Sequence, residues 1–120
     1  MPVSWQQNSG NLGVFTVTGK LTTEELQQVQ SQAELVIQKL GGIKILILLD
    51  DFAGWEKAEG WEDFSFAERN DQYIEKMAIV GDRKWEDLVY AFTLKGLRPF
   101  PIEYFNDGET AAAQQWLLTE

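Results

Sequence analysis

The most distinctive pattern in the chain is an almost unbroken apolar run at residues 43–49, which reads Ile-Lys-Ile-Leu-Ile-Leu-Leu. The run is rich in β-branched residues and lacks the alternation of a strand that has one solvent-exposed face. It is too short to cross a membrane. Such a run predicts a strand buried on both faces, at the centre of a mainly parallel sheet that helices cover. The strand is expected to stop at Asp50 and Asp51, and an aromatic-rich segment follows.

Shorter patterns before and after this strand predict a repeating order of strands and helices. Residues 3–7 and 12–18 flank a Ser-Gly-Asn turn, which favours a β-hairpin at the edge of the sheet. Further along, the pattern predicts helices at residues 21–40, 57–73, 82–96 and up to 118, and strands at 76–80 and 102–105. The order β-β-α-β-α-β-α-β-α implies a mainly parallel sheet with right-handed crossovers.

The helix at residues 21–40 has the clearest local signals. Thr22 and Glu25 form a capping-box pattern at its start, and Gly41 is a stop signal at its end. Its apolar stripe consists of Leu26, Val29, Ala33, Val36, Ile37 and Leu40. The third helix is expected to bury Trp85, Leu88, Val89 and Phe92. Asp82 and Asn106 are expected to cap the third and fourth helices.

Composition and charge exclude several classes of function. The chain of 120 residues contains no cysteine and no histidine, which excludes disulfides, thiolate chemistry, Ser-His-Asp catalysis and histidine zinc sites. Its formal charge of −9, from 19 acidic against 10 basic residues, repels phosphate backbones and anionic lipid headgroups. We therefore expect no nucleic-acid partner, and any peripheral membrane contact would have to be apolar.

The length fits one domain, which we expect to span residues 1–120. Residues 1–6 lack the basic and apolar regions of a signal peptide, and no apolar run is long enough to span a membrane. These features predict a cytoplasmic protein.

Several segments give the chain a resemblance to a known family. They are residues 19–22, 49–55, 61–63, 77–85, 102–105 and 113–117, and the most specific is Ala-Ile-Val-Gly-Asp-Arg-Lys-Trp at 78–85. Through them the chain resembles the bacterial SpoIIAA-like proteins, which share the fold of STAS domains and of SEC14/CRAL-TRIO-type lipid binders. The resemblance implies an α/β fold with a single STAS/SpoIIAA-like domain. Its mixed sheet would have about five strands, mainly parallel with an N-terminal β-hairpin edge, and about four helices would cover it.

One property of that resemblance does not transfer to this chain. Anti-sigma-factor antagonists carry a phosphorylatable serine at the start of the helix after the central strand. The matching residues 55–61 contain neither serine nor threonine, and Ser65 lies further on. A phosphorylation switch is therefore not expected here. The likeness to SEC14-type folds still implies an apolar ligand or a membrane-facing role, by analogy of fold alone.

The carboxyl ends of the predicted strands bring acidic residues toward one edge of the sheet, where ligands of parallel α/β sheets bind. Asp50, Asp51, Asp82 and Asp107 are the residues concerned. One interpretation is a magnesium site in an enzyme. The simpler interpretation assigns helix capping or solvent-exposed turns to each of them. We favour the simpler one and expect no catalytic residues, metal or cofactor.

A second candidate is the sequence Gly-Asp-Arg-Lys at 81–84, because a helix start with two nearby bases can hold an anion. It contains one glycine and lacks phosphate-loop spacing, and Asp82 would occupy the cap position. A structural turn from strand to helix is the favoured interpretation.

The aromatic segment after the central strand is the most informative candidate site. Phe66 lies two residues after Phe64, about 200° around a helix, so one buried stripe cannot easily hold every ring of the segment. Some rings would then line a groove or interface, although packing in the core remains an equal alternative. The candidate ligand-binding residues are Phe52, Trp55, Trp61, Phe64 and Phe66, with Asp51, Gly81 and Asp82.

These observations lead to three hypotheses of function. The first is a non-enzymatic module that binds an apolar or amphipathic small molecule or lipid in a groove near the carboxyl end of the central strand. The second is a protein-interaction module, acting as a homodimer or as a regulator that binds a partner without phosphorylation. The third is a magnesium-dependent enzyme that uses the strand-end aspartates.

Overall fold

The computed structural model describes the backbone of residues 3–8 and all atoms of residues 10–57 and 65–119. The elements are β1 Val3–Asn8, β2 Leu12–Leu21, α1 Thr23–Leu40, β3 Ile43–Trp55, α2 Ser65–Asn70, the 3-10 turn η1 Asp71–Tyr73, β4 Ile74–Gly81, the 3-10 turn η2 Arg83–Trp85, α3 Glu86–Thr93, β5 Ile102–Asn106 and α4 Thr110–Leu118. This order of strands and helices is the one that the sequence predicts.

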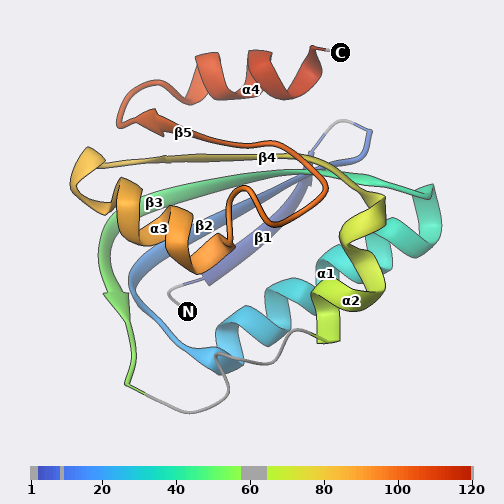
Figure 1. Cartoon of the computed structure of the whole chain (residues 1–120), viewed down its shortest axis with the longest axis horizontal. Coiled ribbons are helices and arrows are strands. Elements are labelled where there is room, and N and C mark those ends of the chain that lie inside the picture. The colour runs from blue at the N-terminus through green and yellow to red at the C-terminus, as the bar shows by residue number, and fades with distance from the viewer. Residues whose placement is uncertain (1–2, 9, 58–64, 120) are drawn as a thin grey trace.

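The strands form one mixed sheet in the order β1-β2-β3-β4-β5. β1 pairs with β2 antiparallel, whereas β2, β3, β4 and β5 are parallel, which confirms the predicted hairpin edge. Because each parallel strand lies beside the next one along the chain, right-handed crossovers carry α1, α2 and α3 to the same face. α4 follows the last strand and covers the opposite face (Figure 1).

The central strand β3 contributes to a hydrophobic core on each face of the sheet. Ile43 and Ile45 belong to the larger core, which α1 and α3 cover, and Leu46 belongs to the smaller core under α4. Ile43 and Leu46 have no exposed surface. The unbroken apolar run is therefore explained, since both faces of the strand need apolar side chains.

The start of α1 confirms the predicted capping box. The Glu25 amide donates to Thr22 Oγ1 at 3.1 Å, and the Thr22 amide donates to Glu25 Oε1 at 2.8 Å. Gly41 ends the helix in the left-handed conformation with φ 84°. Leu40, which the stripe placed in the core, is about half exposed. The buried stripe therefore ends one turn earlier than predicted.

Other boundaries differ from the predictions. Within the described residues the helix expected at residues 57–73 consists of α2 followed by η1, and residues 58–64, with the candidates Trp61 and Phe64, lie outside the described residues. Leu88 is exposed on α3 instead of buried. Asn106 does not cap α4. It lies in β5, where its backbone N–H donates to Glu109 Oε1 at 2.7 Å.

The last residue of β4 is packed too closely for any side chain. A Cβ atom at Gly81 would lie 2.9 Å from Leu49 Cβ and 3.0 Å from Tyr104 Oη. Leu49 and Tyr104 belong to the neighbouring strands β3 and β5, so neither can move away without disturbing the sheet. Gly81 is therefore required by close approach of the strands.

We predict that Gly81→Ala lowers the free energy of unfolding by about 1–3 kcal/mol, the usual cost of overpacking in a core. Urea denaturation followed by tryptophan fluorescence measures it. Gly42→Ala is the control, because the nearest atom to its new Cβ is the end of the Glu75 side chain, at 3.2 Å. Equal stability losses in the two variants would show that the close approach at Gly81 is unimportant.

Candidate functional site

The central strand does not stop at Asp50 and Asp51, as the sequence predicts, but continues to Trp55. Its pairing with β2 changes register twice in this second half. Thr18 pairs with Asp50, Gly19 pairs with Phe52, and Leu21 pairs with Trp55, so β3 carries one extra residue in each interval. Asp51, with φ 51°, and Gly54, with φ 98°, have the positive φ that such bulges use.

These bulges decide which way the aromatic side chains point. In a regular strand Ile45, Ile47, Leu49 and residue 51 would share one face, and residue 52 would lie on the other. The extra residue Asp51 brings Phe52 onto the face of Leu49, and the second bulge brings Trp55 there as well. Accordingly Asp51 is exposed, and Phe52 is buried among the core residues that α1 and α3 cover.

An aromatic cluster forms at this end of the sheet, made of Phe52, Trp55, Trp85 and Phe92. The Phe52 ring centre lies 5.1 Å from that of Trp55 and 4.9 Å from that of Trp85, both edge to face. The Trp55 ring also lies 5.0 Å from Phe92 and 6.1 Å from Trp85. Each of these contacts adds about 0.5–1.5 kcal/mol beyond the burial of surface, so the cluster holds the Trp55 ring firmly.

An apolar cavity of about 320 Å³ lies between the sheet and the helices that cover the larger core. Side chains of β2, β3, β4, α1, α2, α3 and the segment 94–98 line it. Most are aliphatic or aromatic, and the polar ones are Gln30, Asp71, Thr93 and Arg98. The volume is at the lower end of the range of about 300–1,000 Å³ that is usual for small-molecule sites.

The cavity extends along β3, from the amino ends of the parallel strands toward their carboxyl ends. Ile45, Ile47 and Leu49 line its middle, and Phe52 and Trp55 line it at the carboxyl end of the strand. Asp71 and Arg98 line it at the opposite end, where η1 leads into β4. In Figure 1, α2 and the amino end of β4 accordingly lie on the right, and the carboxyl end of β3 lies on the left.

Asp71 and Arg98 form an ion pair at one end of the cavity. Arg98 Nε donates to Asp71 Oδ2 at 2.9 Å, and an Arg98 terminal nitrogen donates to Asp71 Oδ1 at 2.6 Å. The other terminal nitrogen donates to the Thr93 carbonyl at 3.3 Å, and the guanidinium lies 4.7 Å from the centre of the Phe100 ring. Such bidentate pairs are geometrically specific. The pair fixes the segment after α3 against η1, beside Leu97, which is 81% exposed.

Phe66 reaches the cavity from α2, which is fastened to α1 by a buried asparagine. Asn70 Nδ2 donates to Glu34 Oε2 at 2.8 Å and to the Phe66 carbonyl at 3.1 Å. Arg69 Nε also donates to Glu34 Oε2, at 3.1 Å. The hydrogen bond from Asn70 is the main reason that the pKa of Glu34 lies below its ordinary value. Phe66 is thereby held among the residues that line the cavity.

One buried donor beside the cavity lacks a partner. Among the residues that the structure describes, Trp55 Nε1 is a buried side-chain nitrogen that makes no hydrogen bond. A buried tryptophan N–H usually finds an acceptor, and leaving it unpaired costs about 1–3 kcal/mol.

The candidate residues of the sequence therefore separate into three groups. Phe52, Trp55 and Phe66 come together around the cavity. Asp51, Gly81 and Asp82 are not among the residues that line it, and Trp61 and Phe64 lie outside the described residues.

Sequence reasoning missed several residues that the fold brings to the cavity. Asp71, Leu97 and Arg98 line it, and no local pattern marks them, because the partners of the ion pair are 27 positions apart. The aliphatic residues Ile47 and Leu49 were assigned to the strand and not to a site. Trp85, which the sequence pattern places in the core, packs against the larger core as part of the aromatic cluster and is not among the residues that line the cavity.

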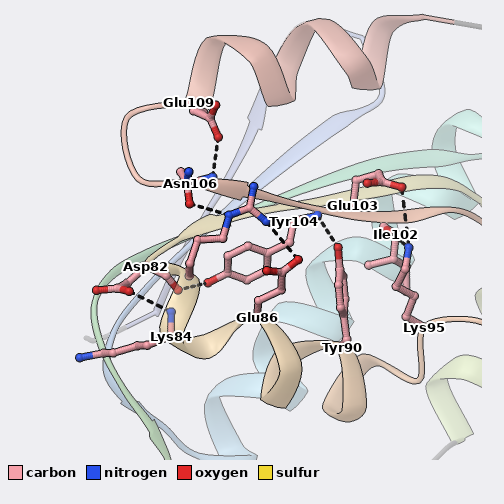
Figure 2. A network of polar contacts seen from close by, with 11 residues as sticks. Asp82, Lys84, Glu86, Tyr90, Lys95, Ile102, Glu103, Tyr104, Asn106 and Glu109 are labelled. Atoms are coloured by element: carbon pink, nitrogen blue, oxygen red, sulfur yellow. Dashed lines mark hydrogen bonds and ion pairs between the residues drawn. The ribbon is translucent and has the colours of Figure 1, made fainter.

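The turn after Gly81 is structural, as the favoured interpretation of residues 81–84 states (Figure 2). Asp82 Oδ1 accepts from the Lys84 amide at 2.9 Å, which caps η2 and confirms its predicted capping role. Tyr104 Oη donates to the Asp82 carbonyl at 2.7 Å. Arg83 Nε donates to Asn106 Oδ1 at 2.6 Å, and Arg83 also pairs with Glu86 at 3.0 Å. Arg83, the basic residue closest to the helix start, is thus already bound to protein groups instead of being available for an anion.

The strand-end aspartates do not form a metal site within the described part of the chain. Asp50 and Asp51 are exposed on β3, and Asp82 caps η2. Residues 10–57 and 65–119 contain no group of three or more acidic side chains placed to hold a metal ion. The hypothesis of a magnesium enzyme therefore has no ligand cluster to support it there.

Comparisons with known proteins agree with the fold that the sequence implies. The family model described as SpoIIAA-like matches residues 12–118. An uncharacterized protein with a SpoIIAA-like fold from Shewanella loihica PV-4 has a similar crystal structure, with a TM-score of 0.71 and 19% identity over 96% of this chain and 91% of that one. Among curated proteins no match is found. At 19% identity the structural likeness shows the fold alone.

No helix in the described residues is long and apolar enough to cross a membrane.

The bulge at Asp51 gives a testable prediction. Asp51 is exposed with φ 51°, a conformation that glycine adopts freely and a β-branched residue adopts only with strain. We expect Asp51→Val to lower the free energy of unfolding by about 1–3 kcal/mol, and Asp51→Gly to change it by less than about 1 kcal/mol. Thermal and urea unfolding measure both variants. A valine variant as stable as the glycine variant would contradict the bulge.

The buried tyrosines give a prediction about alkaline pH. Burial raises the pKa of Tyr104 to about 12 and also raises the pKa of Tyr90. Because the folded state favours the neutral phenol, the contribution of Tyr104 to stability is complete below about pH 10 and is lost as the pH rises toward 12. In an ultraviolet titration we expect a late ionisation near pH 12 that Tyr104→Phe removes and Tyr73→Phe keeps. A wild-type titration without that late step would contradict the burial of Tyr104.

Proposed function

Because the chain belongs to the SpoIIAA-like family, we propose that it is a non-enzymatic binding domain. It holds one apolar or amphipathic small molecule, such as a single lipid chain, in the cavity beside β3. The observation that carries the proposal is the cavity itself, about 320 Å³ in volume and lined mainly by apolar side chains. Burial of apolar ligand surface there supplies about 25 cal/mol for each Å² removed from water.

The chemistry of the lining supports binding in preference to catalysis. Among the described residues that line the cavity the charged side chains are Asp71 and Arg98, and they are joined to each other by two hydrogen bonds. The sequence has neither the histidine nor the cysteine that most nucleophilic sites use. The exposed Leu97 at the Arg98 end offers an apolar surface where a ligand can enter.

The alternative of a protein interface has less support among the described residues. The exposed leucines are spread over the described residues: Leu35 and Leu40 are on α1, Leu88 is on α3, Leu97 follows α3, and Leu118 is on α4. α4 covers the opposite face of the sheet from α1 and α3 (Figure 1). These residues therefore do not form one apolar patch of the kind that marks a binding surface.

The proposal predicts how two neighbouring positions of β3 respond to enlargement. Ile47 lines the cavity, whereas Leu48 packs against the smaller core on the other face. We expect Ile47→Trp to fill the cavity and weaken binding of the neutral apolar probe N-phenyl-1-naphthylamine at least about tenfold, which is about 1.4 kcal/mol. The control Leu48→Trp should keep the wild-type affinity even if the overpacked core lowers its stability.

Fluorescence titration of the solvent-extracted protein measures the affinity and the number of sites. The expected wild-type result is one probe per chain. If the wild-type protein does not bind the probe, or if both variants bind it like the wild type, the cavity is not the binding site.

A further inference from the structure

The indole N–H of Trp55 is a fixed hydrogen-bond donor on a side chain that lines the aromatic end of the cavity, opposite the end lined by Asp71 and Arg98. Its ring is held by Phe52, Trp85 and Phe92 at centre-to-centre distances of 5.1, 6.1 and 5.0 Å. The aromatic cluster restricts the rotation that would bring the N–H to water. Trp55 lines the cavity, and its buried nitrogen has no acceptor in the part of the chain that the structure describes. A ligand that supplies an acceptor there would recover the cost of about 1–3 kcal/mol of the unpaired donor.

The acceptor must be uncharged. A carboxylate beside Trp55 would lose its hydration among aromatic rings, and burying an unpaired charge is far more costly than burying a neutral polar group. Among the described residues no cation lines this end of the cavity, since Lys84, whose Nζ lies 5.8 Å from the centre of the Trp85 ring, is not a lining residue. The cation that lines the cavity, Arg98, lies at the other end and has both oxygens of Asp71 bound to it at 2.6 and 2.9 Å. The formal charge of −9 adds a general repulsion against anions.

The volume limits the size of the apolar part. About 320 Å³ is roughly twice the 150 Å³ of an engineered apolar cavity that binds benzene. That space fits one short chain or a compound of two or three rings, and it is too small for a two-chain lipid.

We propose, building on the function proposed above, that the cavity selects a neutral amphiphile, with a single chain or two to three rings, whose polar group is a hydrogen-bond acceptor such as a ketone, ester or alcohol. The acceptor oxygen lies against Trp55 Nε1 at the carboxyl end of β3. The apolar part extends along Leu49 and Ile47 toward the Arg98–Asp71 pair. The cavity discriminates against free carboxylic acids, which are charged at neutral pH.

Compounds with a matched eight-carbon chain test the proposal by displacement of N-phenyl-1-naphthylamine at pH 7.5. The series is 2-octanone, octane, methyl octanoate and sodium octanoate. We expect methyl octanoate to bind at least about tenfold more tightly than octanoate, because only the anion loses hydration that the cavity does not replace. Trp55→Phe should weaken the binding of 2-octanone about three- to tenfold more than the binding of octane, which corresponds to the loss of one net hydrogen bond.

Trp116→Phe is the control, because Trp116 packs against the smaller core on the other face of the sheet and is not among the residues that line the cavity. It should leave the ratio of 2-octanone to octane affinity unchanged. A ¹H–¹⁵N spectrum gives an independent readout. The indole signal that Trp55→Phe removes should shift downfield with 2-octanone and stay in place with octane.

The outcomes separate this inference from the function on which it rests. If neither the probe nor any compound of the series binds the wild-type protein, the proposed function fails. Two results would leave the cavity as a binding site but overturn the selection of a neutral acceptor by Trp55. One is an affinity for octanoate equal to that for its methyl ester. The other is a loss of affinity for octane in Trp55→Phe as large as the loss for 2-octanone.

Discussion

The two register shifts in the second half of β3 are the constraint on which the cavity depends. Without the first of them Phe52 and Trp55 would both lie on the α4 face of the sheet, and the cavity would lack these two rings. Two hydrogen bonds of Glu56 hold the chain at the end of the shifted strand. The Glu56 amide donates to the Leu21 carbonyl at 3.0 Å, and Glu56 Oε2 accepts from the Thr23 amide at 2.9 Å. A carboxylate at the start of α1 also suits the positive end of the helix dipole.

The two faces of the sheet are built differently, and this difference gives the fold its site. Under α4 the core is closed, since Leu46, Ala78, Ala113 and Leu117 have no exposed surface. On the other face α1, α2 and α3 cover the sheet around a cavity. The Arg98–Asp71 pair and the Asn70–Glu34 hydrogen bond join the short elements there. These polar contacts therefore hold the short elements around the cavity, where apolar packing is incomplete.

The sequence predicts the fold well and the site only in part, for physical reasons. Local signals such as the Thr22–Glu25 capping box, or the unbroken run at 43–49, depend on neighbouring residues and predict the elements correctly. The end of β3 was predicted too early, because two aspartates favour a turn and pairing with β2 outweighs that preference. Phe52, Trp55 and Phe66 were recognised by composition. Arg98 and Asp71 meet only through the tertiary fold, so no spacing reveals them.

Native mass spectrometry of the protein as purified, followed by solvent extraction, tests the central claim most directly. The account predicts one neutral small molecule of suitable size, bound at close to one per chain and lost on extraction. It should be absent from Ile47→Trp and present in Leu48→Trp, whose enlarged residue faces the other core. A wild-type spectrum with only the mass of the polypeptide, from a protein that also fails to take up added 2-octanone, would contradict a ligand in this cavity.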